Sequence, residues 1–414
     1  MTPEIKHRIG QIRRGEVPER YVKTALGLAP ANWKRYTFGD IYTERKEPGD
    51  ENLPLLMVSI HSGVSDGEVD AAELPKQVKR IEDKSQYKKA VSGDLVFNMM
   101  RAWQGAIGTV RTTGMVSPAY IVAEPNDKVN PLFMDYYSRT PQMINQIDRQ
   151  SYGVTDFRKR LYWDSFAPIS CTLPPIEEQQ KIAAILTTQD RVIELKEKRL
   201  AEKQRQKKYL MQQLLTGKKR LPGFYGAWSF PKAKELFQSV SDKDHNGDLA
   251  VLSSTQDRGI VPRDEVDIDI KYDACSLVNY KKVSKGNFVI SLRSFQGGIE
   301  YSAYAGLVSP AYTVLSSRKE ISDGYYKQFF KSTDYINRLN VTVYGIRDGK
   351  QISYEDFGRL RIPYPPIKEQ DAIAEVLSTA DHEIDLLQQD IEQEKQKKKA
   401  LMQLLLTGIV RVKT

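Results

Sequence analysis

Cysteine is scarce in this sequence, and other features that define common protein classes are missing. Cys171 and Cys275 are the only cysteines, and no Cys/His set has metal-ligand spacing, so neither a disulfide framework nor a structural zinc site is expected. No apolar run approaches the roughly 20 residues that span a bilayer, and the N-terminal segment lacks the apolar stretch of a secretion signal. We therefore expect a cytoplasmic protein with two buried thiols and no membrane partner. The histidines are scattered, without ligand or triad spacing: His7, His61, His245 and His382.

Motifs for catalysis are also missing. The sequence contains neither the Asn/Asp-Pro-Pro-Tyr/Phe motif of adenine methyltransferases nor a glycine-rich cofactor loop, and it has no Gly-x-x-x-x-Gly-Lys-Ser/Thr loop for ATP. The Pro-Pro pairs at 174–175 and 365–366 follow Leu and Tyr and begin helices, so they are structural. The nuclease-like triplets at 82–84 and 269–271 are of a kind that is common by chance. We expect no catalytic site, cofactor or metal in this chain.

The composition that is present is typical of a basic protein with several domains. The chain has 414 residues, of which 40% are apolar and 28% charged, and this is enough to build two or three cores. Its formal net charge of +9 favours a polyanionic partner such as nucleic acid.

The chain contains two copies of one long motif. Residues 174–221 align without a gap to residues 365–412, and nearly half of the aligned positions are identical. The first copy begins PPIEEQQKIAAIL and reaches LMQQLLTG, and the second begins PPIKEQDAIAEVL and reaches LMQLLLTG. Because the identities gather at the two ends, we infer that the middle needs only to be helical.

The regions that precede the two copies repeat more faintly. Each contains an Arg-x-x-Gln-Gly cluster, a Gly-x-Val-Ser-Pro-Ala-Tyr segment and a later Tyr-Gly pair. Apolar, β-rich runs such as DLVFNM and FVISL predict short strands, residues 134–147 predict a helix between strands, and the Ser-Pro-Ala-Tyr segments are assigned to the core. The predicted order is therefore globular unit, helix, globular unit, helix.

Each copy of the long motif predicts one long helix. Pro-Pro ends any earlier helix, Gly217 and Gly408 supply the C-terminal stop, and no Pro or Gly lies between these marks. This leaves roughly 40 residues of helix, or about 60 Å. A heptad seam runs from Ile182 to Leu214 and from Ile373 to Leu405, and such a seam requires a helical partner.

Charge identifies that partner as the other helix, in antiparallel orientation. Residues 196–208 carry seven basic and two acidic side chains, whereas residues 381–394 carry six acidic side chains and neither Lys nor Arg. Antiparallel pairing places these blocks side by side, whereas parallel pairing would set the basic block against residues 387–399, with three acids and four lysines. Unpaired helices and a coiled coil between chains are the alternatives. The expected fold is α+β, with two mixed α/β domains separated by a long antiparallel two-helix coiled coil in a pseudo-two-fold repeat.

Two similar domains on a rigid spacer suit a ligand that presents two sites at a fixed distance, as DNA half-sites do. The motifs also resemble a known family. PPIxEQxxIAxxL, leading through a charged helix to LMQxLLTG, resembles the conserved helical regions of type I restriction-modification specificity subunits. The Gly-x-x-Pro-x-x-Trp opening at 27–33, and residues 222–228 with a different spacing, are similar to the start of that family's target-recognition domains. The resemblance covers almost the whole chain.

The resemblance implies a division of the chain and a set of partners. Target-recognition domains are expected at 31–173 and 222–364, conserved helical spacers at 174–221 and 365–414, and a helical segment at 1–30. Each recognition domain is expected to read one half of a bipartite double-stranded DNA target. The implied partners are two methyltransferase subunits, which use S-adenosylmethionine, and restriction-translocase subunits, which use ATP and Mg. These cofactors are therefore expected outside this chain.

Candidate DNA contacts fall in two clusters per globular unit. Base reading requires forked donors and acceptors, Arg for guanine and Asn or Gln for adenine, while Lys and Arg also contact phosphates. The same side chains could instead satisfy backbone groups of a fold that both units share. The candidates are Arg101, Gln104, Tyr152, Arg158, Lys159 and Arg160 in the first unit and Arg293, Gln296, Tyr344, Arg347, Lys350 and Gln351 in the second.

The ends of the long helices are candidate docking surfaces for the methyltransferase subunits, with packing inside the chain as the alternative. A coiled-coil interaction scaffold without sequence-specific DNA binding is the alternative function, and a salt titration separates the two because phosphate contacts weaken with salt. The docking candidates are Pro175, Ile176, Gln179, Leu210 and Leu214 with their copies Pro366, Ile367, Gln370, Leu401 and Leu405.

Overall fold

Two compact units make up the chain. The structure is a computed structural model that describes residues 3–24, 27–50, 52–60, 63–66, 86–153, 159–266, 274–342 and 352–412. Unit 1 consists of residues 1–195 and 391–414, and unit 2 consists of residues 196–390. Each unit therefore contains a globular region together with part of each long helix.

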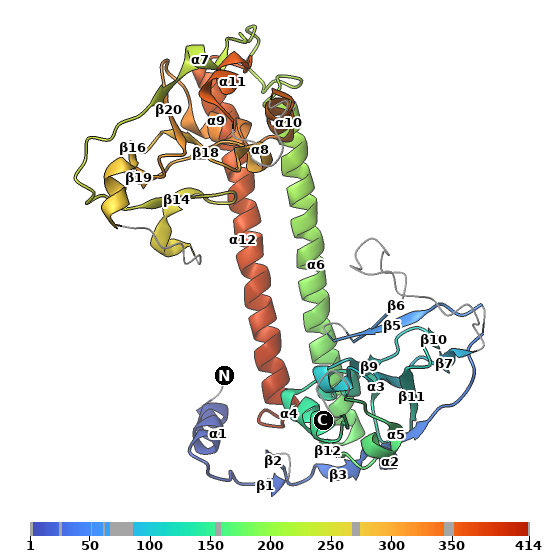
Figure 1. Ribbon diagram of the computed structural model, residues 1–414. Coiled ribbons are helices and arrows are strands. Elements are labelled where there is room, and N and C mark those ends of the chain that lie inside the picture. The colour runs from blue at the N-terminus through green and yellow to red at the C-terminus, as the bar shows by residue number, and fades with distance from the viewer. Residues whose placement is uncertain are drawn as a thin grey trace. The chain divides into compact units, whose positions relative to one another are not determined.

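Unit 1 is built around a four-stranded antiparallel sheet in the order β4-β11-β8-β9, accompanied by the two-stranded sheets β1-β2, β3-β12, β5-β6 and β7-β10 (Figure 1). Its strands are β1 (Tyr21–Thr24), β2 (Gly27–Pro30), β3 (Lys34–Thr37), β4 (Tyr42–Glu44), β5 (Leu56–Ser59), β6 (Gly63–Asp66), β7 (Lys88–Ala90), β8 (Leu95–Asn98), β9 (Ile107–Thr109), β10 (Gly114–Val116), β11 (Tyr120–Pro125) and β12 (Ser170–Leu173). Its short helices are α1 (Pro3–Arg13), α2 (Phe38–Ile41), η2 (Ala102–Gln104), α3 (Pro131–Tyr137), α4 (Pro141–Arg149) and α5 (Trp163–Phe166).

The central sheet of unit 1 is buried on both faces. Along β8, Leu95 and Phe97 belong to the main core, whereas Val96 between them belongs to a second apolar cluster. Ile121 and Val122 on β11 divide between the same two clusters. Because successive side chains of a strand point to opposite faces, a sheet buried on both sides requires a nearly continuous apolar run. The DLVFNM segment supplies this run, and the strand predicted there is confirmed.

Unit 2 repeats this arrangement with a four-stranded antiparallel sheet in the order β13-β20-β17-β18 and the two-stranded sheets β14-β15 and β16-β19. Its strands are β13 (Phe237–Val240), β14 (Leu252–Thr255), β15 (Gly259–Pro262), β16 (Lys281–Val283), β17 (Phe288–Ile290), β18 (Glu300–Tyr301), β19 (Gly306–Val308) and β20 (Thr313–Ser317). Its short helices are α7 (Ala233–Leu236), η4 (Arg263–Glu265), η5 (Ala274–Asn279), α8 (Ser294–Gly297), α9 (Asp323–Phe329), α10 (Thr333–Thr342) and α11 (Tyr354–Arg359). On β17, Phe288 and Ile290 contact the main core and Val289 the second cluster, as on β8.

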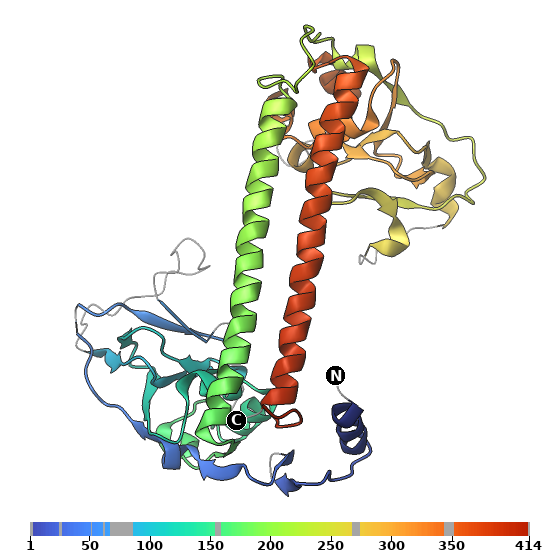
Figure 2. The ribbon, with the colours of Figure 1, turned by 180° about the vertical axis from the view of Figure 1, so that it is seen from behind.

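The two long helices, α6 (Ile176–Leu214) and α12 (Ile367–Leu405), run antiparallel in each unit (Figures 1 and 2). In unit 2 the ion pairs are Lys196–Asp390 at 2.8 Å, Lys203–Glu383 at 2.6 Å and Lys207–Asp381, so residue numbers rise on one helix as they fall on the other. In unit 1, Asp190 pairs with Lys398 at 2.5 Å and Gln189 donates to Glu394 at 2.6 Å. The antiparallel pairing predicted from charge is therefore confirmed.

Each unit's main core includes the first turns of one long helix and the last turns of the other. Unit 1 buries Ile182 and Leu186 of α6 with Leu405 of α12, and unit 2 buries Leu214 of α6 with Leu377 of α12. Both ends of the heptad seam are thus buried as predicted, because they complete a globular core as well as a helix pair.

Glycine ends both helices in the left-handed conformation that the sequence predicts. Gly217 and Gly408 both have a φ of +71°. A Cβ on Gly408 would lie 2.5 Å from a ring carbon of Pro30, and one on Gly217 would lie 3.1 Å from the ring of Trp228. The Thr-Gly pair is therefore fixed both by backbone conformation and by close packing.

The structure agrees with the expectation of a buried thiol at Cys171. Cys171 is buried, and its burial raises the pKa of the thiol to about 12. The side chain of Cys275 lies outside the described residues. Across the described ranges, no helix combines the length and the apolar character needed to cross a membrane.

Candidate nucleic-acid interface

The Arg-x-x-Gln cluster of unit 1 forms a tight turn directly after the central strand β8. The N–H of Arg101 donates to the carbonyl of Asn98 at 3.1 Å, and the carbonyl of Arg101 accepts from the N–H groups of Gln104 at 3.0 Å and Ala106 at 3.1 Å. Gly105 ends the turn with a φ of +103°. The backbone is thus fixed, while the side chains of Arg101 and Gln104 are exposed.

The second cluster of unit 1 lies against this turn. Tyr152 and Arg160 exchange backbone hydrogen bonds of 2.9 and 2.8 Å, and both side chains are exposed. Lys159 differs, because its ammonium group donates to Asp148 at 2.8 Å and lies 5.2 Å from the ring centroid of Trp103. The structure therefore brings the two clusters together and gives Lys159 a role in joining them. Arg158 lies outside the described residues.

Unit 2 presents the equivalent first cluster on α8, directly after β17. The carbonyl of Arg293 accepts from the N–H groups of Gln296 at 2.9 Å and Gly297 at 3.2 Å. The side chains of Arg293 and Gln296 are exposed, as are those of their counterparts in unit 1. The residues predicted for the second cluster, Tyr344, Arg347, Lys350 and Gln351, lie outside the described residues.

Other identities between the units are structural. A Cβ on Gly306, at the start of β19, would lie 2.4 Å from the carbonyl oxygen of Ala250, and one on Gly114 would lie 2.6 Å from that of Pro54. The ammonium of Lys281 donates to the carbonyl of Tyr312 at 2.7 Å, in the Ser-Pro-Ala-Tyr segment. Burial lowers the pKa of Lys281. The two glycines repeat because the backbone packs too closely there to accept other residues. The lysine repeats together with its acceptor, since Lys88 donates to the carbonyl of Tyr120 at 2.8 Å in unit 1.

A buried carboxylate at the start of each long helix was missed by sequence reasoning. Glu369 of α12 is fully buried and accepts from both Arg220, at 2.5 and 2.7 Å, and the indole of Trp228, at 2.9 Å. Glu178 of α6 is held in the same way by Arg411 and Trp33. The available signal was the alignment itself, which pairs Arg220 with Arg411.

The unit 1 version of this network has the same geometry. Arg411 donates two hydrogen bonds of 2.7 Å to Glu178, and the indole of Trp33 donates a third at 3.3 Å. Such a bidentate arginine-carboxylate pair is geometrically specific. The Glu of the PPIxEQ motif therefore fastens each long helix to the globular region of its own unit.

The burial of the predicted docking residues divides them into two groups. Gln179 and Gln370 are fully buried, and their amide groups satisfy backbone groups, including the carbonyls of Pro174 and Pro365. Because these glutamines are needed inside their own units, their assignment to a partner surface is corrected. Leu214 and Leu405 are buried in the same unit cores and are corrected likewise. The remaining candidates are exposed or half-buried: Pro175, Ile176, Leu210, Pro366, Ile367 and Leu401.

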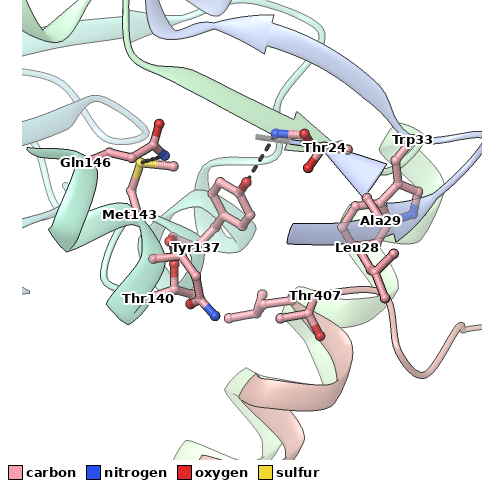
Figure 3. Close-up of a pocket in the computed structure, with 12 residues that line it drawn as sticks. Thr24, Leu28, Ala29, Trp33, Tyr137, Thr140, Met143, Gln146 and Thr407 are labelled. Carbon is pink, nitrogen blue, oxygen red and sulfur yellow. Dashed lines mark hydrogen bonds between the residues drawn. The ribbon is translucent and has the colours of Figure 1, made fainter. Parts of the chain in front are cut away.

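A cavity of about 50 Å³ lies in unit 1 beside the end of α12 (Figure 3). It is lined by Ala29 and Trp33 from the N-terminal region, Tyr137 and Met143 from the helical region, and Thr407. The hydroxyl of Tyr137 accepts from the N–H of Thr172 at 3.1 Å. A space of this size holds about one or two water molecules, far less than a cofactor requires. Among the described residues, no group of three or more His, Cys, Asp or Glu side chains is placed to hold a metal ion.

The chain thus consists of two similarly built units, each with an exposed Arg-x-x-Gln turn after its central strand. A family model described as the type I restriction modification DNA specificity domain matches residues 65–205 and 227–396. The two matches cover most of the chain and fall one in each half. The chain therefore belongs to the family of type I restriction-modification DNA-specificity proteins, and the resemblance noted in its motifs is confirmed.

Individual relatives agree with this assignment. The MjaX protein of Methanocaldococcus jannaschii, assigned as a type I restriction enzyme specificity subunit, is 25% identical over 96% of this chain and 98% of its own length. The MjaVIII specificity subunit of the same organism is 24% identical over 95% and 97%. The HsdS subunit of Thermoanaerobacter tengcongensis is similar in structure, with a TM-score of 0.51 and 19% identity over 92% of this chain and 98% of its own. A chain from a study of assembly of a type I restriction-modification system has a TM-score of 0.55 and 20% identity over 92% and 99%. These structures share the fold.

Proposed function

We propose that this chain gives a type I restriction-modification complex its sequence specificity, with unit 1 and unit 2 each reading one half of a bipartite DNA target. The observation that carries the proposal is the exposed Arg-x-x-Gln turn that follows the central strand in both units, at Arg101 and Gln104 and at Arg293 and Gln296. A fixed backbone with exposed forked side chains is what base reading requires.

The chemistry of these side chains fits the edges of base pairs in the major groove. Arginine donates two hydrogen bonds to O6 and N7 of guanine, and glutamine pairs with N6 and N7 of adenine. In unit 1, the exposed Tyr152 and Arg160 extend the surface next to the turn. Because Lys159 is already bound to Asp148, we assign it to holding this surface and not to the DNA. The proposed contacts in the second cluster of unit 2 keep their sequence assignment.

The methyl-transfer and ATP-driven steps are proposed to belong to partner subunits that bind S-adenosylmethionine, ATP and Mg. The proposed docking surface for two methyltransferase subunits consists of the exposed or half-buried positions at the helix ends, chiefly Pro175 and Ile176 in one copy and Pro366 and Ile367 in the other. Their support is that the same residue types have the same exposure in both copies, with the prolines exposed and the isoleucines half-buried. The continuous helices α6 and α12, each of 39 residues, are proposed to set the length of unread DNA between half-sites.

The decisive experiment is co-expression of this chain with its methyltransferase subunit, followed by mapping of methylated adenines. We expect a gapped, two-part motif, whereas a continuous motif or none contradicts the proposal. The R101A and R293A variants should each relax one position in a different half-site, at a cost of about 1 to 3 kcal/mol in binding. If either substitution weakens binding equally for all sequences, that arginine contacts a phosphate and not a base.

A further inference from the structure

Lys331, directly after α9, connects three segments of unit 2. Its ammonium group donates to the carbonyl of Gly297 at 2.9 Å, the carbonyl of Gln256 at 3.1 Å and the carboxylate of Glu300 at 2.5 Å. Gly297 ends α8, Gln256 lies in the turn between β14 and β15, and Glu300 begins β18. Glu300 is almost completely buried, so this ion pair is an internal one.

The same segments also pack closely against one another. A Cβ on Gly297 would lie 2.9 Å from the side chain of Gln256. Gly298, which has a φ of +81°, leaves no room for a side chain, because a Cβ there would lie 2.0 Å from the carbonyl oxygen of Phe330. The end of α8 is therefore packed between the β14–β15 turn and the segment that carries Lys331.

Exposed polar side chains gather where these segments meet. The β14–β15 turn exposes Gln256, Asp257 and Arg258, and the adjoining α8 exposes Arg293 and Gln296. One guanidinium nitrogen of Arg258 donates to the carbonyl of Glu265 at 3.0 Å, and another lies 3.9 Å from the carboxylate of the same residue. Since arginine has five N–H donors, these two contacts orient the group and leave donors for a ligand. The two segments together present a second Arg and Gln next to the first.

Unit 1 shows that the shared fold does not require this ion pair. Arg139 aligns with Lys331, but its guanidinium binds Asp135 of the preceding helix α3, donating to the carbonyl at 3.0 Å and to the carboxylate at 3.3 Å. The position of Glu300 is occupied in unit 1 by Gly108. The Lys331–Glu300 ion pair therefore has no counterpart in unit 1, although the guanidinium of Arg139 also lies next to a hairpin residue, 3.3 Å from a Cβ built on Gly63 at the start of β6.

We propose that the β14–β15 turn is a second DNA-contact segment of unit 2, reading base edges through Gln256 and Arg258, and that Lys331 is the positioning residue that holds this turn in register with Arg293 and Gln296. The proposal rests on the proposed function and extends it from one contact segment to two. A fixed spacing between the segments matters because base contacts tolerate little displacement of a forked side chain.

The test uses the full chain assembled with its methyltransferase subunit and a panel of DNA duplexes, each changed at one base pair of the target. Half-site assignment comes from R293A, and the half-site read by unit 1 serves as an internal reference. We expect R258A or Q256A to reduce discrimination roughly 10- to 100-fold at one position of the unit 2 half-site. We expect K331M to reduce discrimination at the same positions, K331R to restore most of it, and R139M to leave these positions unchanged.

Thermal unfolding of each variant separates positioning from folding. A purely structural Lys331 would lower the melting temperature in K331M while the folded protein kept its discrimination, and this result overturns the positioning role. Unchanged discrimination in both Q256A and R258A overturns the contact segment. If the wild-type complex has no two-part target, the proposed function fails; if it has one that R293A relaxes but these variants do not, only the present inference fails.

Discussion

Unit 1 and unit 2 share the same arrangement of strands and helices and differ in the polar contacts that stabilise it. Both have the four-stranded sheet buried on two faces, and both bury a glutamate bound by an arginine and a tryptophan at the start of a long helix. The differences lie elsewhere. Unit 2 has the Lys331–Glu300 pair under its β14–β15 turn, whereas unit 1 has Arg139 bound to Asp135.

The comparison distinguishes residues that the fold requires from residues that contact the ligand. Two units that read different half-sites must agree where the fold needs a given residue and can differ where the ligand is contacted. The buried Glu178 and Glu369 and the closely packed Gly114 and Gly306 fall in the first class. Identity between the units at buried positions is therefore evidence of structural need, and DNA contacts should be sought at exposed positions in and around the shared turn.

The largest effect is expected at a glycine whose packing differs between the units. Gly298 and Gly105 both end the turn after the central strand with positive φ, but a Cβ would lie 2.0 Å from the nearest atom at Gly298 and 3.5 Å at Gly105. G298A should destabilise unit 2 by about 4 kcal/mol, because strain and overpacking add. G105A should cost unit 1 about 1 to 2 kcal/mol, from backbone strain alone. Calorimetric unfolding of the two variants measures the difference.

The control for both is G226A, at an exposed glycine with nothing within 4 Å of the added Cβ. Equal losses in G298A and G105A would mean that the Phe330 segment moves away without cost, and would remove the packing difference between the units.

The second effect should be the same in both units. E369A leaves Arg220 and Trp228 without their shared acceptor, and E178A does the same to Arg411 and Trp33. Breaking a buried pair typically costs about 3 to 5 kcal/mol, and we expect about 3 kcal/mol here because the arginines are partly exposed. Urea unfolding of the two variants should give losses that agree within about 1 kcal/mol.

The exposed neighbour Glu177 supplies the control, since E177Q alters the same turn of α6 without touching the network. A loss of stability in only one of the two glutamate variants would show that the same geometry does not give the same stabilisation in both units.

Much of the architecture was predictable from the sequence because its signals are local or repeated. The DLVFNM strand follows from its apolar run, the long helices from their Pro-Pro and Thr-Gly ends, and the antiparallel pairing from two opposite charge blocks. The candidate DNA surface was found through the repeated Arg-x-x-Gln turn. Each of these signals lies within one segment or between two aligned ones.

Whether an individual repeated residue is buried or exposed was not predictable in this way. Gln179 and Gln370 were assigned to a partner surface, yet they satisfy backbone groups inside their units. A polar residue repeated at a helix start is compatible with either role, and only its distant partners decide. The connection of Lys331 to Gln256 likewise joins residues whose types vary between the units, so no alignment could reveal it.

The third effect is a pH dependence of the stability of unit 2. Burial raises the pKa of Glu300 to about 6, against the attraction of Lys331, and Asp257 raises it further. Because the folded state then binds this proton more tightly than the unfolded state, the stabilisation is complete below about pH 4.5 and is lost as pH rises through about 6. The change is about 2 kcal/mol. The difference in unfolding free energy between wild type and E300Q, followed from pH 4.5 to 7.5, isolates it.

E320Q serves as the comparison for this series, since Glu320 is exposed in the same unit. If wild type and E300Q keep a constant difference across the pH range, folding does not raise the pKa of Glu300.

The smallest effect concerns the helix pair, at one of the seam positions where the units differ. Gln189 in unit 1 is buried and donates to the Glu394 carboxylate at 2.6 Å, whereas the aligned residue in unit 2 is Ala380. Q189A should destabilise unit 1 by about 1 kcal/mol, the usual worth of one hydrogen bond. Q189L, which keeps the volume, separates the bond from the packing, and urea unfolding measures both. Equal stability of Q189L and wild type would mean that the seam gains nothing from the amide of Gln189, and that this position does not distinguish the two units.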